Sequence, residues 1–306
     1  MNLFLKKILS KSPLVSADWD LLLKQSHRVE PGMTSAGFGG RNSVNHLDSY
    51  GTLVQNLKER LAEVEFGRPL RILDLACGDG HLLYQILQKL PSVDLAVGLD
   101  FSDEELALAS NTCRAAIQSG RAEFLFGDAR QMPFPDAHFG AVTSHMALML
   151  MHPFELVRNE ILRVLQPGGV LVALIASQNS EGHYAETLDV LHQFFKANDI
   201  DWSPSKQFRE ARLNSVEGWR ELFPLSDFEI LEFRKIQFEF AFTAEETWEL
   251  FRPTYMVAAL PPDLKIKCEQ TLKAFADSKK PQPGQKFEYP MMMIAGKRKK
   301  AAEKSI

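Results

Sequence analysis

Cysteine is scarce in this 306-residue chain. The sequence holds three cysteines, Cys77, Cys113 and Cys268, which stand far apart and form no Cys-x-x-Cys pair. A disulfide framework or a structural zinc site needs paired or regularly spaced cysteines, so the sequence argues against both. Few, unpaired cysteines are typical of a reducing compartment, and we expect a cytoplasmic protein without a bound metal ion.

Long hydrophobic runs and an excess of positive charge are also missing. No apolar run reaches the roughly 20 residues that a membrane-spanning helix needs. The formal net charge is −4, which does not fit a nucleic-acid binder held by a basic surface. The basic, amphipathic start, MNLFLKKILSKSPLV, lacks the uninterrupted apolar core of a secretory signal. We expect it to pack on its own domain as a helix; an organelle presequence or a membrane-surface helix is the alternative.

What the sequence does contain is an alternation of short buried strands and helices between Pro69 and Ala176. Such alternation is typical of an α/β fold with a parallel, doubly wound sheet and helices on both faces. Ser102 and Glu105 predict a capping box at the start of one helix, and Pro153 is expected at the first position of another. The predicted strands cover 71–76, 94–100, 122–128, 139–147 and 170–176, and the helices cover 81–90, 103–118 and 153–165.

Outside this stretch the chain is mostly amphipathic helix. A helical run is expected over 49–64, preceded by a flexible, turn-rich patch over 35–43. Helical insertions are expected at about 178–225 and 243–279, the second as a pair of helices. Strands over 227–242 and 286–299 close the chain; in the latter, Met291 to Met293 are expected to pack in the core.

The stretch DLACGDGHLL, residues 74–83, joins the first strand to the first helix. Gly78 and Gly80 lack a Cβ, so the backbone can approach a ligand closely, and the free N–H groups of the helix start point into the same space. Alone this is a weak signal, because NAD-binding folds have such a loop too. Cys77 and His81 lack further ligands at metal spacing; Cys77 is expected to be a small residue in a crowded turn.

Three acidic residues narrow the choice of ligand. Asp100 ends the second strand, twenty residues after Gly80, where a carboxylate suits the two hydroxyls of a ribose. Asp128 ends the predicted third strand and is placed to accept a hydrogen bond from an exocyclic amine such as that of adenine. Asp74 lies inside the first strand, where NAD-binding folds usually carry an apolar residue. Acids around the loop favour a cationic ligand over a pyrophosphate.

The motifs LDLACGDG, VGLDFS, GDARQMPFPDAHFGAV and RVLQPGG, in this order and spacing, resemble those of the class I S-adenosylmethionine-dependent methyltransferases. The resemblance is greatest to the small-molecule group that includes the ubiquinone and menaquinone methylases, although Ala76 stands where many members have glycine. It covers about a third of the chain and says little about residues 1–66 or 178–285. It implies a seven-stranded Rossmann-like sheet with an antiparallel last strand. From the helical pattern of the remaining chain we expect this domain over 67–306, after an N-terminal helical cap over 1–66.

The resemblance also implies S-adenosylmethionine as cofactor and a small-molecule acceptor. For Asp74 two roles stay open: bracing the loop, or direct or water-mediated contact with the cofactor ammonium. The cap and the 178–225 segment are expected to cover the bound cofactor. Carried over by position, the resemblance implies that Ala76, Gly78 and Gly80 line the methionine end of the cofactor and that Asp100 binds the ribose. It implies that Phe101, Asp128 and Ala129 contact the adenine, and that Ser144 and His145 lie near the sulfonium.

Methyl transfer from a sulfonium is an in-line displacement, which gains most from alignment in a dry pocket. His145 is the leading candidate for a general base, ahead of His152, Tyr50 and Tyr184; it can equally be a polar wall residue that moves no proton. Three alternatives remain. The same cofactor can serve cyclisation or aminoalkyl transfer that releases methylthioadenosine, the chain can be a non-catalytic regulator that binds the cofactor, or it can be a NAD-dependent reductase.

Overall fold

The computed structural model describes residues 16–40, 46–64, 69–177, 181–200 and 208–300. Its contacts divide the chain into two compact units. The sheet unit comprises the described parts of Tyr50–Gln178, Glu210–Ile236 and Met291–Ile306, and the helical unit comprises those of Met1–Ser49, Asn179–Arg209 and Gln237–Pro290. The sequence pattern assigns residues 50–66 to an N-terminal cap, whereas their described part clusters with the sheet. The amphipathic residues 1–15 lie outside the described residues.

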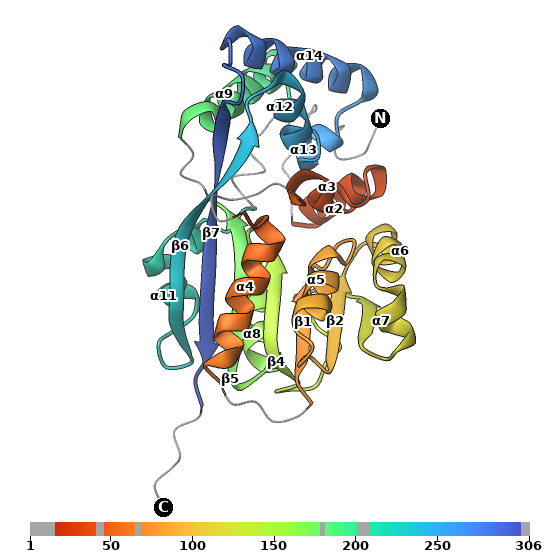
Figure 1. Cartoon of the computed structure of the whole chain (residues 1–306), viewed down its shortest axis with the longest axis vertical. Coiled ribbons are helices and arrows are strands. Elements are labelled where there is room, and N and C mark those ends of the chain that lie inside the picture. Colours follow the sequence, from red (N-terminus) through yellow and green to blue (C-terminus); the bar gives the residue numbers. More distant parts are fainter. Residues whose placement is uncertain (1–15, 41–45, 65–68, 178–180, 201–207, 301–306) are drawn as a thin grey trace, which may run out of the picture. The chain divides into compact units, whose positions relative to one another are not determined.

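One seven-stranded sheet organises the chain, in the order β3-β2-β1-β4-β5-β7-β6 (Figure 1). Neighbouring strands from β3 to β5 pair in parallel, and β7 runs antiparallel to β5. This confirms the predicted doubly wound sheet with its antiparallel last strand. The strands are β1 (Arg71–Leu75), β2 (Leu95–Asp100), β3 (Ala122–Phe126), β4 (Phe139–His145), β5 (Leu165–Ala176), β6 (Phe228–Ala241) and β7 (Lys286–Arg298).

The central strands form the core of the sheet unit. Every residue of β4 is buried, as are nearly all of β1, β2 and β5. Strands covered on both faces read as continuous apolar runs, which is why the sequence reveals them. Met291 and Met293 are fully buried opposite Ala176 and Leu174 of β5, so their predicted core role is confirmed.

Helices flank this sheet where the sequence predicts them, with three local differences. The helix expected over 103–118 breaks at Cys113, whose backbone leaves helical geometry at φ −104° and ψ 19°. Pro153 is the N-cap of its helix rather than the first helical residue. Strand β5 already begins at Leu165, before the glycine turn expected to precede it. The helices are α4 (Ser49–Ala62), α5 (His81–Lys89), α6 (Asp103–Thr112), α7 (Arg114–Gln118), η1 (Leu148–Leu150), α8 (Phe154–Val164), η2 (Ala211–Asn214) and α11 (Val216–Leu222).

The helical unit has its own aromatic and ionic packing. Fully buried Trp19 contacts the rings of Phe208 and Tyr255, with centroids 5.9 and 5.1 Å away. Glu30 forms ion pairs with Arg252 and Lys265. Among its described helices, as elsewhere in the described chain, none is long and apolar enough to cross a membrane. The helices are α2 (Ser16–Val29), α3 (Met33–Phe38), α9 (Gly182–Ala197), α12 (Ala244–Phe251), α13 (Tyr255–Ala258) and α14 (Pro262–Ser278).

Two sequence predictions about this unit are wrong. The stretch 35–43 is not turn-rich throughout, because residues 35–38 belong to α3. Gly37 is a packing glycine there: a Cβ on it would lie 3.1 Å from Cγ of Pro253. The insertion expected as a pair of helices holds three, since the short α13 separates α12 from α14.

Candidate functional site

The polar residues singled out in the sequence gather at the carboxyl ends of β1, β2 and β4, which lie side by side in the sheet (Figure 1). Asp74 lies within β1, Asp100 ends β2, and Ser144 and His145 are the last two residues of β4. The carboxyl ends of parallel strands are where an open α/β sheet binds its ligands. All of these residues belong to the sheet unit, so their arrangement is set within one compact body.

The loop between β1 and α5 is built on left-handed backbone. Ala76, Gly78 and Gly80 have φ angles of 58°, 51° and 77°. Glycine adopts these angles freely, whereas a residue with a Cβ is strained by about 1–2 kcal/mol. The structure therefore explains why glycine is common at position 76 in the family that the sequence resembles. It also shows that this chain retains the loop at the cost of one strained alanine.

The two glycines of the loop serve different needs. A Cβ on Gly80 would lie 3.0 Å from Cβ of Ala109 and 3.2 Å from Cζ of Phe124, so Gly80 lets α6 pack closely against the loop. A Cβ on Gly78 would meet a single atom within 4 Å among the described residues, Oε2 of Glu105 at 3.8 Å. Gly78 therefore faces open space, and Gly80 does not.

Asp100 is held in place by two backbone donors. The N–H of Gly78 donates to its Oδ2 at 2.9 Å, and the N–H of Ser102 donates to its Oδ1 at 3.0 Å. The side chain is 6% exposed. Charge-assisted bonds of this kind are stronger than bonds between neutral groups. They fix the carboxylate beside the open face of Gly78.

These bonds modify the predicted capping box. Oγ of Ser102 accepts from the N–H of Glu105 at 3.3 Å, which confirms Ser102 as the N-cap of α6. In a complete capping box the Glu105 side chain would accept a hydrogen bond from the N–H of Ser102. Here that N–H donates to Asp100 instead. The Glu105 side chain, 1% exposed, instead borders the open face of Gly78. Sequence reasoning missed this residue at the site because its spacing from Ser102 already had a local explanation.

Asp74 is almost entirely buried, at 1% exposure. Its Oδ1 accepts from Oγ1 of Thr143 at 3.0 Å, and its Oδ2 has no hydrogen-bond partner among the residues that the structure describes. Burial raises the pKa of this carboxyl from 3.8 to about 8, with the nearby Asp100 and Asp79 acting in the same direction against the Thr143 hydrogen bond. These surroundings thus favour a protonated Asp74 at pH 7.

His145 and Ser144 form the β4 side of the site. Oγ of Ser144 donates to the Leu75 carbonyl at 2.9 Å. The His145 ring stacks on Tyr50 of α4, with centroids 3.9 Å apart and planes at 21°, while Tyr50 meets His81 edge-on at 4.6 Å. Burial lowers the pKa of His145 from 6.5 to about 3, and His81 acts in the same direction. The imidazole is therefore neutral at physiological pH and a weak base.

Asp128 lies two residues beyond β3 and is half exposed. The guanidinium of Arg130 donates hydrogen bonds to this carboxylate. Its Nε donates to both oxygens, at 2.9 and 3.0 Å, and its Nη2 donates to Oδ2 at 2.6 Å. Nη1 of Arg130 also donates to the carbonyl of His152 at 2.9 Å. Arg130 thus ties the Asp128 loop to the segment before α8. Phe101 and Ala129 are both half-buried.

Cys77 matches its prediction as a small residue in a crowded turn. Its Sγ would lie 2.7 Å from a Cβ on Gly98, so the thiol fills the space above a glycine of β2. Burial raises the pKa of the thiol well above its ordinary value, with Asp100 and Asp74 adding to the shift. A thiol that stays protonated is inert as a nucleophile or metal ligand. In the described part of the chain, no group of three or more His, Cys, Asp or Glu side chains is arranged to hold a metal ion.

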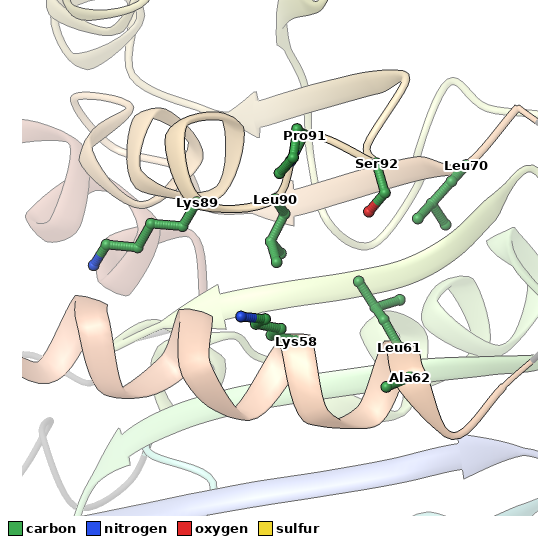
Figure 2. A pocket seen from close by; sticks show the side chains of 8 residues that line it. All are labelled: Lys58, Leu61, Ala62, Leu70, Lys89, Leu90, Pro91 and Ser92. Carbon is green, nitrogen blue, oxygen red and sulfur yellow. The ribbon is translucent and has the colours of Figure 1, made fainter.

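A separate groove lies at the other end of the strands. It is bounded by α4 on one side and by the turn between α5 and β2 on the other (Figure 2). Leu70 and Ser92, which line it, precede the first residues of β1 and β2, so the groove is remote from the carboxyl ends of these strands. It contains none of the residues that the sequence motifs single out. The lining residues are Lys58, Leu61, Ala62, Leu70, Lys89, Leu90, Pro91 and Ser92.

Comparison with known proteins gives a consistent result at the sequence level. A family model described as a methyltransferase domain matches residues 72–169. Over 134 residues the chain is 37% identical to a demethylmenaquinone methyltransferase of Thermus thermophilus, covering 43% of this chain and 58% of the relative. Over 154 residues it is 34% identical to a 2-phytyl-1,4-naphthoquinone methyltransferase of Synechococcus elongatus, covering 50% and 64%. The matched stretches thus span about six-tenths of the relatives' length.

Solved structures share the fold at low sequence identity. A [4+2]-cyclase, SpnF, superposes with a TM-score of 0.57 at 19% identity, covering 91% of this chain and 96% of the other. A structure described as a putative sarcosine dimethylglycine methyltransferase from Galdieria sulphuraria gives a TM-score of 0.55 at 14% identity, covering 90% and 98%. These likenesses concern the fold, which proteins with different reactions share.

Proposed function

Because the chain belongs to the class I S-adenosylmethionine-dependent methyltransferase family, we propose that it transfers the methyl group of S-adenosylmethionine to a small-molecule acceptor. The observation that supports this most directly is the bond between Gly78 and Asp100. It joins the glycine loop to a buried carboxylate at the carboxyl ends of β1 and β2. A hydroxyl-binding acid beside an open glycine is what a nucleoside cofactor requires.

The residues present fit this cofactor. S-adenosylmethionine is cationic at its sulfonium and its ammonium, and the site offers carboxyl groups at Asp74, Asp100 and Glu105. The open face of Gly78 leaves room for a ligand against the backbone. Oδ2 of Asp74, buried and without a partner among the described residues, can accept a hydrogen bond from a donor that arrives with the ligand.

We assign the cofactor contacts by position in the family motifs. The orientation of Asp100 by two backbone donors supports its assignment to the ribose. The crowding at Gly80 supports a structural reason for that glycine, with its backbone alone available to the cofactor. In this proposal the methionine part meets Asp74, Ala76, Gly78 and Gly80, the adenosine meets Asp100, Phe101, Asp128 and Ala129, and the β4 side is formed by Ser144 and His145.

When bound, the cofactor supplies an electrophilic methyl group. The protein aligns the two reactants and excludes water from the pocket in which they meet. Binding that aligns a nucleophile with the methyl group is worth about 7–11 kcal/mol in favourable cases. The neutral His145 ring is fixed by its stack on Tyr50. It can accept a hydrogen bond from the molecule that receives the methyl group and so orient that molecule. A base with a pKa of about 3 is poorly matched to removing a proton at pH 7. We therefore assign His145 to orientation rather than to proton transfer.

The acceptor class to test first is a reduced naphthoquinone. The relatives described above are named for demethylmenaquinone and 2-phytyl-1,4-naphthoquinone, and the chain matches them over about half of its own length. Their acceptors are small molecules with a fused ring system. The family-model match over residues 72–169 contains the candidate site from Asp74 to His145, and the helical unit lies outside it.

The test is to incubate the protein with S-adenosylmethionine and a reduced naphthoquinone and to identify the nucleoside product. Formation of S-adenosylhomocysteine with a methylated acceptor supports methyl transfer. Methylthioadenosine as the product supports cyclisation or aminoalkyl transfer instead. Tight binding of the cofactor with no turnover on any acceptor supports a regulator. No binding of S-adenosylmethionine or S-adenosylhomocysteine would contradict the proposal.

A further inference from the structure

Asp74 has an incomplete set of hydrogen bonds to the residues that the structure describes. Thr143 donates to Oδ1 at 3.0 Å, while Oδ2 is buried without a partner among the described residues. An ionised carboxylate with a buried oxygen that accepts no bond is costly. A proton on the carboxyl relieves this cost, which accords with the raised pKa of about 8.

Among the described residues, the titratable groups that interact with the charge of Asp74 carry no positive charge at pH 7. Asp100 of β2 and Asp79 of the loop raise the pKa of Asp74. The buried thiols of Cys77 and Cys113 also have raised pKa values and stay neutral. Two residues beyond Thr143 on β4, His145 is neutral because its pKa is about 3. Such surroundings favour a ligand group that brings both a hydrogen-bond donor and a positive charge.

We propose that Asp74 selects ligands bearing a cationic amine and that their binding expels one proton from its carboxyl group to solvent. This inference rests on the proposed function, since the amine at hand is the α-ammonium of the methionine part of the cofactor. The proton balance is simple. The neutral carboxyl and the ammonium combine to give a carboxylate–ammonium pair, and the carboxyl proton leaves to buffer.

The first test is calorimetry with S-adenosylhomocysteine, which has the α-ammonium, and with methylthioadenosine, which lacks the amino-acid part. When binding of a ligand expels one proton from a carboxyl group, the affinity rises about tenfold for each unit of increase in pH. This continues until the pH reaches the pKa of that carboxyl group. We expect that slope for S-adenosylhomocysteine between pH 6 and 7.5, levelling off near pH 8, and no slope for methylthioadenosine. Titrations in buffers with different ionisation enthalpies should show release of about one proton at pH 6.5 for the first ligand alone.

Two variants isolate the residue. Asp74→Asn keeps an oxygen for the Thr143 hydroxyl and cannot ionise, so its affinity for S-adenosylhomocysteine should be independent of pH and below wild type at pH 8. Its affinity for methylthioadenosine should be unchanged. The matched control is Asp94→Asn: this exposed carboxylate accepts from the Leu70 N–H at 2.7 Å, at the other end of the sheet. It should keep the wild-type slope.

The outcomes separate this inference from the proposed function. If S-adenosylhomocysteine binds with a pH-independent affinity and releases no proton, the inference is overturned and the proposed function stands. The same slope for methylthioadenosine would overturn the assignment to the ammonium. Failure of S-adenosylhomocysteine to bind at any pH would overturn both. If Asp74→Asn does not fold, the wild-type slope and proton count still decide.

Discussion

The backbone N–H of Gly78 donates to Oδ2 of Asp100 across 2.9 Å, linking the loop after β1 to the end of β2. This bond places an open glycine face and a buried carboxylate next to each other before any ligand arrives. Because Ser102 holds the other oxygen of the same carboxylate, the loop, the strand end and the start of α6 form one connected frame. The predictions below test the parts of that frame separately.

The strained alanine of the loop gives the first prediction. Ala76 sits at φ 58°, so Ala76→Gly should raise the free energy of unfolding by about 1 kcal/mol, as relief of left-handed strain outweighs the added flexibility of the unfolded chain. Urea denaturation measures it. The control is Ala107→Gly at an exposed position within α6, which should lower the same quantity by about 1 kcal/mol. Destabilisation by both substitutions would mean that residue 76 is unstrained.

The two loop glycines should respond in opposite ways to a side chain. Gly80→Ala places a Cβ about 3 Å from Ala109, which should destabilise the fold markedly. Gly78→Val points its side chain into open space, so its fold should suffer chiefly from left-handed strain, while binding of S-adenosylhomocysteine should be lost. Thermal melts and calorimetry on both variants compare stability with binding. Normal binding by Gly78→Val would remove the loop from the cofactor site.

The buried Asp74 predicts how stability depends on pH in the ligand-free protein. Its pKa is about 8 when folded against 3.8 ordinarily, so the contribution of this group is full below pH 3.8 and is lost as pH rises toward 8. Asp74→Asn does not titrate, so its melting temperature should exceed that of wild type by a margin that grows from pH 5 to pH 8. Differential scanning fluorimetry across that range is sufficient. A margin that stays constant with pH would show that Asp74 is ionised in the folded protein.

The stack of Tyr50 on His145 predicts a positioning role for a residue of α4. Tyr50→Phe keeps the ring and should leave turnover within about twofold, whereas Tyr50→Leu removes the aromatic face, worth about 0.5–1.5 kcal/mol, and should lower kcat more than it raises KM. NMR of the His145 ring should show it neutral down to about pH 4 in wild type. Equal activity of the two variants would reduce the stack to core packing.

Much of the fold could be read from the sequence because its central strands are buried on both faces and appear as apolar runs. The glycine loop and Asp100 were likewise recognisable, since their spacing along the chain is what the site requires. What local spacing does not carry is contact between distant segments. Three features depend on such tertiary packing: the stack of Tyr50 on His145, the hydrogen bonds from Arg130 to Asp128, and the inclusion of α4 in the sheet unit.

Local rules also competed with one another. A capping box would pair the Ser102 N–H with the Glu105 side chain, but this N–H donates to the buried Asp100 carboxylate instead. That exchange moved Glu105 to the border of the site, and no helix-capping rule could have predicted it. Similarly, Gly37 looked like a turn residue until its contact with Pro253, more than two hundred positions away, explained it.

The most direct test of the account is hydrogen exchange, followed by mass spectrometry, with and without S-adenosylhomocysteine. Binding at the carboxyl ends of the strands should slow exchange in peptides covering 74–83, 99–105, 127–131 and 143–147. It should leave the groove residues 58–62 and 89–92, at the other end of the sheet, unchanged. Protection confined to the groove, or equal exchange in all these peptides at saturating ligand, would contradict the proposed site.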